Sequence, residues 1–325
     1  MKAIICSRWC KPEDLEMLEV GSPNISPNQV KVAVHAAGVN FPDTLIIEGK
    51  YQFKPELPFS PGSEIAGEII EVGEQVENFT KGDRVMAAFS HGGFAEEVCI
   101  NYKKLTKIPE SMDYIIAASM SLTYGTSSFA LFQRADIKKT DTVLIHGSTG
   151  GVGITALEIS KAVGAKVIAT ASNEEKLKIA KDYGADYCIN YSNKEFKDEV
   201  KEITNGKGAD IIYDPVGGSI FEQSLRCIAW NGKLLVIGFA SGKIPSAPAN
   251  LPLLKNSSIV GVFWGAWTER EPEGHNLNMK KIFSWWKAKK INPRIYNVYD
   301  FDQTNDALYD LLNRKVIGKA VIKIR

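Results

Sequence analysis

Short apolar runs separated by turn-forming residues make up the first 115 or so positions, and none of these stretches has helical periodicity. The runs end at pairs such as Pro61-Gly62 and Gly92-Gly93, which is typical of strands joined by tight turns. The pattern therefore predicts a β-rich, barrel-like domain. Its expected strands are Lys2–Cys6, Gln29–Ala37, Ile65–Val72, Asp83–Ala88 and Ala95–Ile100.

From about Asp113 the pattern changes to amphipathic helices that alternate with nearly continuous apolar strands. This alternation indicates a doubly wound parallel sheet that helices cover on both faces. The expected helices are Tyr114–Phe132, Val152–Val163, Glu174–Tyr183, Lys194–Thr204 and Ser219–Ile228. The expected strands are Thr142–His146, Ala165–Thr170, Asp186–Asn190, Asp210–Asp214 and Gly232–Gly238.

After about Ser257 the pattern is mixed again and the remaining length is too short for a third domain. We expect this tail to rejoin the first domain, so that residues 1–118 and 258–325 form one domain and residues 119–257 the other. The elements expected in the tail are strand Ile259–Trp264, helices Lys280–Lys289 and Asp302–Arg314, and strand Lys319–Ile324.

A glycine-rich run joins the first strand of the doubly wound domain to its next helix. Glycine lets a backbone turn tightly and approach a ligand, and the first amides of a helix attract phosphate. A tight strand-to-helix turn without a ligand is the alternative, and there is no Gly-Lys-Ser/Thr ending of a triphosphatase loop. The residues predicted to hold phosphate are Gly147, Ser148, Thr149, Gly150, Gly151 and Val152.

The end of the next strand favours NADPH over NADH, because no acidic residue stands there to accept from both ribose hydroxyls. Ser172, Lys176 and Tyr191 are the candidates for the 2′-phosphate. Ser172 and Glu175 also have the spacing of a helix capping box, and Lys176 is equally explained as a solvated helix residue. The charges of Glu174 and Glu175 oppose a phosphate unless these side chains face away.

Composition narrows the class of protein. The 325 residues carry 39 lysines and arginines against 38 aspartates and glutamates, which gives no basic field for nucleic acid or an anionic membrane. The cysteines lack the paired spacing of a metal knuckle, and the first residues lack the apolar core of a secretory signal. We expect a cytoplasmic protein.

The chain resembles the medium-chain dehydrogenase/reductase superfamily, in its zinc-free quinone oxidoreductase branch, over almost its whole length. The resemblance implies a GroES-like catalytic domain into which a Rossmann domain is inserted. The motifs that carry it are residues 37–43 (AGVNFPD), 61–67 (PGSEIAG), 81–85 (KGDRV), 92–96 (GGFAE), 236–242 (VIGFASG) and 248–256 (PANLPLLKN).

The chain departs from the zinc enzymes of this superfamily where their metal ligands stand. Asn40 replaces a ligand cysteine and Ser63 a ligand histidine, which leaves Glu64 as one possible carboxylate, and the cysteine-rich structural loop is missing. Zinc needs three or four sulfur, nitrogen or carboxylate ligands. We therefore expect no metal. Without a Lewis acid, the resemblance implies hydride transfer from NADPH to an acceptor that is already electron-poor, a quinone or an α,β-unsaturated carbonyl.

The resemblance also implies roles for single residues. Asn40 matches an amide near the nicotinamide and substrate, although a turn residue before Phe41-Pro42 is its alternative. Tyr51 matches a tyrosine that donates a proton to the enolate oxygen, or it closes a loop beside Phe53. Thr126 matches a threonine that holds the cofactor, or it is a hydroxyl at a helix start.

Further cofactor contacts are implied in two segments, one in each expected domain. Gly238, Phe239 and Ala240 form the turn after the last Rossmann strand, and Phe263, Trp264 and Gly265 stand at the end of the expected strand Ile259–Trp264. Phe263 and Trp264 are equally explained as core or interface aromatics.

Two other functions remain open at the level of sequence. One is reduction of an enoyl thioester, for which a carrier phosphate could be bound by Lys287, Lys289, Lys290 and Arg294, although these residues are equally explained as a solvated helix face. The other is a non-enzymatic NADPH-binding protein. In the family the segment Ile259–Phe263 pairs across a two-fold axis, so we also expect a homodimer.

Overall fold

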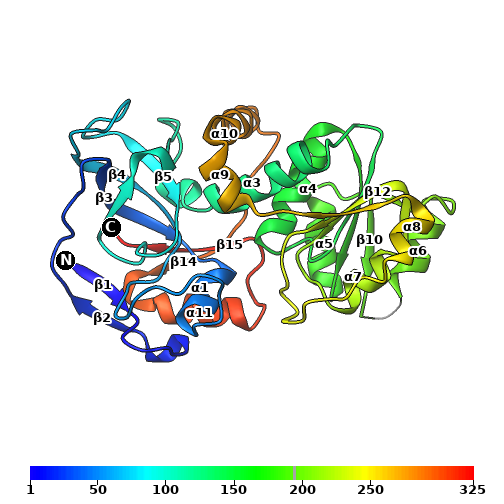
Figure 1. The fold of residues 1–325 in the computed structure, drawn as a ribbon, viewed down its shortest axis with the longest axis horizontal. Coiled ribbons are helices and arrows are strands. Elements are labelled where there is room, and N and C mark those ends of the chain that lie inside the picture. The colour runs from blue at the N-terminus through cyan, green and yellow to red at the C-terminus, as the bar shows by residue number, and fades with distance from the viewer. Residues whose placement is uncertain (193–194) are drawn as a thin grey trace. The chain divides into compact units, whose positions relative to one another are not determined.

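The computed structural model describes residues 1–192 and 195–325, which form two compact units (Figure 1). Unit 1 contains residues 1–122 and 293–325, and unit 2 contains residues 123–292. Residues 258–292, which the sequence analysis grouped with the first domain, therefore lie in unit 2. Strand pairing explains this, because β13 (Ser258–Gly261) extends the sheet of unit 2 beside β12 (Ile228–Val236).

Unit 1 is β-rich, as predicted. In the described residues its larger sheet has seven strands in the order β14-β15-β3-β4-β5-β7, with β6 paired to β3, and β1 and β2 form a separate pair. The strands are β1 (Lys2–Ile5), β2 (Glu16–Glu19), β3 (Gln29–Gly38), β4 (Glu64–Val72), β5 (Arg84–Ala88), β6 (Glu97–Asn101), β7 (Leu105–Lys107), β14 (Ile295–Asp300) and β15 (Lys319–Lys323).

The core of unit 1 lies on the alternating inward face of these strands. Val30, Val32 and Val34 of β3 are completely buried, as the two-residue period of a strand requires when one face is covered. Pairing of β3 with β4, β6 and β15 brings the beginning and the end of the chain into one sheet.

Unit 1 also contains helices, although no helical periodicity was found in its first 115 residues. They are α1 (Phe41–Ile47), α2 (Tyr114–Ala117) and α11 (Thr304–Leu312), with single 3-10 turns at Pro12–Asp14, Tyr102–Lys104 and Phe301–Gln303. Pro42 stands in the first turn of α1, where a missing amide hydrogen costs nothing, so the Phe41-Pro42 pair begins a helix rather than a loop.

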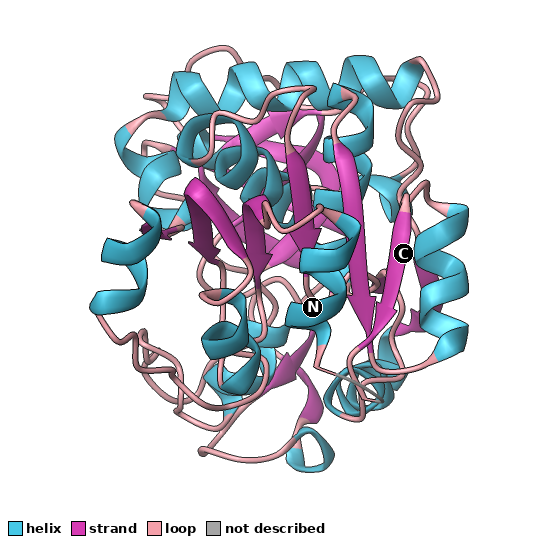
Figure 2. Ribbon diagram, turned by 90° about the vertical axis from the view of Figure 1, so that its right-hand side faces the viewer, coloured by secondary structure: helices cyan, strands magenta, loops and turns pink. Residues whose placement is uncertain are grey.

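Unit 2 is the predicted doubly wound domain. Its described residues form a six-stranded parallel sheet in the order β10-β9-β8-β11-β12-β13, with helices on both faces (Figure 2). This is the strand order of a dinucleotide-binding fold. The remaining strands are β8 (Thr142–Ile145), β9 (Lys166–Ala171), β10 (Tyr187–Asn190) and β11 (Ala209–Asp214).

The first helices of unit 2 follow the expected alternation with shifted ends, whereas the helices at Asn250–Lys255 and Trp264–Arg270 were not expected. The expected helix Lys194–Thr204 begins at Phe196, and Lys194 itself lies outside the described residues. The helices are α4 (Gly151–Val163), α5 (Glu174–Asp182), α6 (Phe196–Ile203), α7 (Ser219–Ser224), α8 (Asn250–Lys255), α9 (Trp264–Arg270) and α10 (Pro272–Lys287), and α3 (Ser121–Ser128) spans the boundary between the units.

The single helix expected over Tyr114–Phe132 is broken in the structure. The amides of Ser119 and Met120 bond three residues back, which tightens the chain and ends α2 before Ser121. After α3 the chain continues as a π-helical segment, Phe129–Arg134.

One carboxylate contacts both ends of unit 2. Glu158 in α4 accepts a hydrogen bond from Tyr124 Oη at 2.5 Å and from the amide of Asn292 at 2.5 Å. Burial raises the pKa of Glu158 to about 7, against the lowering effect of these two hydrogen bonds.

Candidate functional site

The glycine-rich turn lies between the carboxyl end of β8 and the first turn of α4. Gly147 has φ +52°, a left-handed conformation that glycine adopts without strain. A Cβ at Gly153 would lie 2.1 Å from the carbonyl oxygen of Gly147, so only glycine fits there. A Cβ at Gly150 would lie 3.4 Å from the same oxygen and meets nothing else within 4 Å.

The side chains of this turn point into the protein. Ser148 is completely buried and its hydroxyl donates to the carbonyl of Thr170 at 3.1 Å, and Thr149 is 4% exposed. Ser148, Thr149, Gly150, Gly151 and Val152 can therefore offer a ligand mainly their backbone at the start of α4. Such an arrangement fits a pyrophosphate, because amides and the helix dipole attract it together.

Of the residues predicted for the 2′-phosphate, Ser172 and Tyr191 lie on neighbouring loops after β9 and β10, where the amide of Tyr191 donates to the carbonyl of Ala171 at 3.2 Å, and Lys176 lies in the first turn of α5. Ser172 is joined to the β10 loop by the hydroxyl of Ser192, which donates to the Ser172 carbonyl at 2.9 Å. Tyr191 is partly buried against the core of unit 2. Glu174, whose charge opposes a phosphate, accepts from the side-chain amide of Asn190 at 2.8 Å.

The predicted capping box of Ser172 and Glu175 is wrong. Asn173 is the N-cap residue of α5, and its side chain accepts from the amide of Lys176 at 2.9 Å. The helix begins one residue later than the serine cap requires, so the asparagine satisfies the amide of Lys176 instead of that of Glu175, and Ser172 lies outside the helix.

The loop after β12 packs against the turn after β11. The amide of Ala240 donates to the carbonyl of Pro215 at 3.0 Å, and the buried Asp214 carboxylate accepts from the amides of Val216 and Gly217. Gly238 and Phe239 are half-buried and Ala240 is exposed at the carboxyl edge of the sheet. Ligands of open α/β sheets bind outside this edge.

Phe263, Trp264 and Gly265 lie at the start of α9 rather than at a strand end, because β13 stops at Gly261. Trp264 packs on Gly125, where an added Cβ would lie 2.6 Å from the indole ring. Phe263 is 71% exposed. Thr126 is half-buried in α3, next to Gly125, and lies within the helix rather than at its start.

Of the two residues predicted in unit 1, Asn40 belongs to a buried polar cluster. Lys319 donates to Glu64 Oε2 at 2.9 Å, to Asn40 Oδ1 at 2.6 Å and to the carbonyl of Val39 at 2.9 Å. Asn40 Nδ2 donates to Glu64 Oε2 at 2.9 Å. Asn40 is 5% exposed and Glu64 is completely buried.

A second carboxylate joins this cluster. Asp43 accepts from the Ser63 hydroxyl at 2.7 Å and from the amide of Asn40 at 2.8 Å. Burial raises the pKa of Asp43 to about 6, and these two hydrogen bonds oppose the rise. Tyr51 packs against the core of unit 1, and burial followed by the charge of Asp43 raises its pKa.

The donor set does not fit zinc. At the positions where the zinc enzymes hold their metal, Asn40 and Ser63 offer neutral oxygens and nitrogens, and the Glu64 carboxylate is paired with the Lys319 ammonium. Within residues 1–192 and 195–325, no group of three or more histidine, cysteine, aspartate or glutamate side chains is arranged to hold a metal ion.

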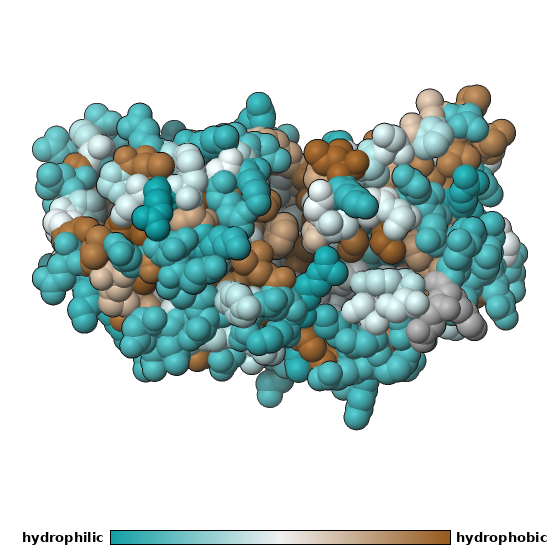
Figure 3. Space-filling view, turned by 90° about the horizontal axis from the view of Figure 1, so that it is seen from below, coloured by the Kyte–Doolittle hydropathy of each residue, from teal (hydrophilic) through white to brown (hydrophobic). Residues whose placement is uncertain are grey.

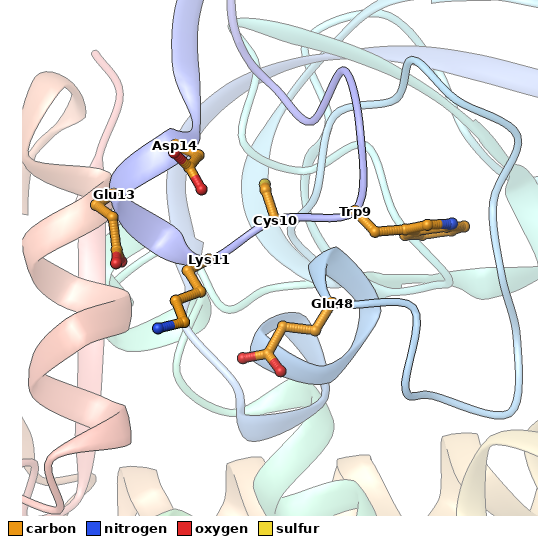
Figure 4. A pocket seen from close by; sticks show the side chains of 6 residues that line it. All are labelled: Trp9, Cys10, Lys11, Glu13, Asp14 and Glu48. Carbon is orange, nitrogen blue, oxygen red and sulfur yellow. The ribbon is translucent and has the colours of Figure 1, made fainter.

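A surface pocket of about 530 Å³ in unit 1 has no predicted site residue in its lining (Figure 4). It contains mostly charged side chains from the segment after β1, together with Glu48 beside the end of α1. Its lining residues are Trp9, Cys10, Lys11, Glu13, Asp14 and Glu48. In the described parts of the chain, no helix has both the length and the apolar character to cross a membrane.

Sequence reasoning missed Lys319 and Asp43. Asp43 was part of a quoted motif without a role. Lys319 was placed at the start of the last strand, 255 residues from Glu64, and only the pairing of β15 with β3 and of β3 with β4 brings them together. A lysine at the start of a buried strand is a usable signal, because lysine is almost never buried without a partner.

Comparisons with known proteins agree with this architecture. A family model described as alcohol dehydrogenase GroES-like domain matches residues 26–110, and one described as zinc-binding dehydrogenase matches residues 151–278. Quinone oxidoreductase-like protein 2 homolog of Nematostella vectensis is 42% identical, covering 100% of this chain and 89% of that protein.

Two further relatives are quinone oxidoreductases. The enzyme of Sus scrofa is 33% identical and the alignment covers 99% of this chain and 97% of that protein. The crystal structure of the Escherichia coli quinone oxidoreductase complexed with NADPH superposes with a TM-score of 0.93 at 28% identity, over 100% of both chains.

Proposed function

Because the chain belongs to the medium-chain dehydrogenase/reductase superfamily, in its quinone oxidoreductase branch, we propose that it reduces a quinone or an α,β-unsaturated carbonyl with NADPH. The observation that carries the proposal is the ion pair of Lys319 and Glu64 at the superfamily's zinc position. With an ammonium there instead of a Lewis acid, an unactivated ketone is a poor acceptor. A conjugated acceptor accepts hydride without metal activation.

Unit 2 holds the cofactor in this proposal. The glycine-rich turn offers its backbone to the pyrophosphate, and the surface after β9 carries no acid on the turn that would compete with a 2′-phosphate. Ser172, Lys176 and Tyr191 surround that phosphate. NADPH, when bound, supplies the hydride.

Unit 1 supplies the proton and orients the substrate. Tyr51 keeps its phenolic hydrogen at neutral pH, since both burial and the nearby Asp43 carboxylate raise its pKa. The phenol donates this hydrogen to the oxygen of the acceptor as negative charge develops on it. The rigid Asn40 carboxamide fixes the geometry on which the rate of such a reaction mainly depends.

The test is loss of NADPH absorbance in a stopped-flow instrument with simple quinones, enones and crotonyl thioester. We expect turnover of quinone or enone, and Tyr51→Phe should lower kcat with enones by about 10- to 100-fold with little change in the NADPH Kd. Tyr309→Phe, at an exposed tyrosine, is the matched control.

The other outcomes are equally informative. Faster turnover of the thioester favours the enoyl-thioester alternative. Tight NADPH binding with a raised Tm and no turnover of any acceptor contradicts the proposal and favours a non-enzymatic protein.

We further propose a homodimer built on the free edge of the unit 2 sheet. Beyond β13 the described sheet has no further strand, and apolar side chains gather on unit 2 at the upper right of Figure 3. The exposed apolar residues of β13 and the neighbouring elements include Trp230, Ile244, Leu253, Leu254 and Ile259. A second copy paired along β13 covers such an edge symmetrically.

A cytoplasmic location completes the proposal. All five cysteines lie in the described ranges and none forms a disulfide. Cys6 and Cys10 are free thiols whose sulfur atoms lie 3.7 Å apart, and a reducing compartment would keep them in this state.

A further inference from the structure

Lys319 is a charged residue in an unusual place. It is 5% exposed, and its ammonium has three hydrogens that face three acceptors: Val39 O, Asn40 Oδ1 and Glu64 Oε2. Three neighbouring strands bring these groups together, since β15 pairs with β3 and β3 pairs with β4. Every donor of the ammonium is therefore used inside unit 1.

Both oxygens of the Glu64 carboxylate have partners. Its Oε1 accepts from the amide of Leu122 at 2.7 Å, and its Oε2 accepts from Asn40 Nδ2 and Lys319 Nζ. Packing holds it in place, because a Cβ on Gly38 would lie 2.6 Å from Glu64 Oε2 and 2.2 Å from the carbonyl of Ala118. The carboxylate has no room to turn toward another partner.

Stability alone does not account for this arrangement. Removing two charges from water costs as much as their attraction returns, and well-packed apolar residues commonly give equal or greater stability. The ion pair instead fixes the orientation of the Asn40 side-chain amide. Lys319 can only donate, so it fixes Oδ1 of Asn40 on its own side and Nδ2 on the side of Glu64.

We propose that Lys319 is a positioning residue, which stands beside Glu64 in place of a metal cation and fixes the orientation of the Asn40 carboxamide. The inference rests on the proposed function, in which Asn40 orients the reactants. It also accounts for the misfit with zinc: the one carboxylate retained at the zinc position already has its cation, and that cation belongs to the chain.

Lys319→Met tests the inference, because it keeps most of the side-chain volume and removes the charge. We expect kcat for the best acceptor to fall at least about 10-fold, with the NADPH Kd changed by less than about 3-fold, since the cofactor turn lies in unit 2. The Tm should also fall, by roughly 5–10 °C, because Glu64 is left buried without its partner.

The double variant Lys319→Met/Glu64→Gln separates positioning from stability. It removes both charges of the Lys319–Glu64 ion pair, so most of the lost Tm should return. The new amide at position 64 can both donate and accept, so the Asn40 carboxamide is free to rotate into its flipped orientation. We therefore expect kcat to stay low. If Lys319→Met alone does not fold, the double variant carries the test.

Lys315→Met is the matched control on the same segment. Its ammonium is 57% exposed and pairs with Asp310 at the surface, so both kcat and Tm should stay close to the wild type. Wild-type kcat in folded Lys319→Met, or recovery of kcat together with Tm in the double variant, overturns the role of Lys319. Absence of turnover in the wild type overturns the proposed function instead.

Discussion

At Gly153 the second hydrogen on Cα occupies space that no side chain can take. A Cβ there would lie 2.1 Å from the Gly147 carbonyl oxygen and 2.8 Å from its carbon, both of them backbone atoms. Backbone cannot swing aside as the end of a flexible side chain can, so the turn itself has to move. The geometry of the glycine-rich turn thus depends on the absence of a Cβ at Gly153.

Gly153→Ala should lower the free energy of unfolding by about 1–3 kcal/mol and weaken NADPH binding at least about 10-fold. Gly150→Ala is the control, because its Cβ would lie 3.4 Å from the nearest atom. We expect the control to change the unfolding free energy by less than about 1 kcal/mol. Urea unfolding and titration of NADPH fluorescence measure the two effects. Equal stability of both variants would contradict the structure of the turn.

Among the elements, helix α4 has a second role besides following the glycine-rich turn, because it carries a buried carboxylate that binds two other segments. Glu158 on this helix is 5% exposed and holds Tyr124 of α3 and the backbone of Asn292. Its folded pKa of about 7 lies above the ordinary 4.5, so between these values the folded state keeps a proton that the unfolded chain has released. The contribution of Glu158 to stability is therefore largest at acid pH and is lost as the pH rises through 7.

Glu158→Gln should remove this dependence. Between pH 4.5 and 7.5 the wild type should lose about 3 kcal/mol of unfolding free energy relative to the variant. Urea unfolding at half-unit pH steps checks it, with Glu222→Gln, at an exposed position of α7, as the control. A wild-type pH slope in Glu158→Gln contradicts the assignment.

Long buried apolar runs could be predicted from the sequence, whereas the short helix α1, which buries Ile46 and Ile47, and the elements that bury no residue could not. The strand at Thr142–His146 was predicted because Val143, Leu144 and Ile145 are completely buried, which makes a continuous apolar run. Strand β2 has no buried residue. Helix α8 likewise buries none, so both lack the periodicity that prediction relies on.

The candidate site likewise has one part that could be predicted from the sequence and one part that could not. The glycine turn could be predicted because it is contiguous in sequence, and its chemistry comes from backbone. The cluster around Asn40 could not, since Glu64 and Lys319 join it from separate strands. Strand pairing, which a single sequence does not reveal, decides which distant side chains meet.

For the whole molecule the proposed dimer gives a direct prediction. Leu253→Glu combined with Ile259→Lys places charges on α8 and on the edge strand β13, where pairing of a second copy would have to bury them. In light scattering we expect the wild type at about twice 35.8 kDa and the variant at 35.8 kDa. Leu18→Lys, on the outer strand pair of unit 1, is the control. A monomeric wild type contradicts the proposal.

The hydrogen bonds of Glu158 to Tyr124 and Asn292 bring the two ends of unit 2 together. Tyr124 stands near the first residue of unit 2 and Asn292 is the last, so the chain enters and leaves this unit at neighbouring points. When the two ends of an inserted domain are adjacent, the host domain has only a short gap in its chain, here between Leu122 and Pro293. This gap does not depend on the length of the loops of unit 2 that lie far from Glu158. The nucleotide-binding unit can therefore vary at those loops without altering the fold into which it is inserted.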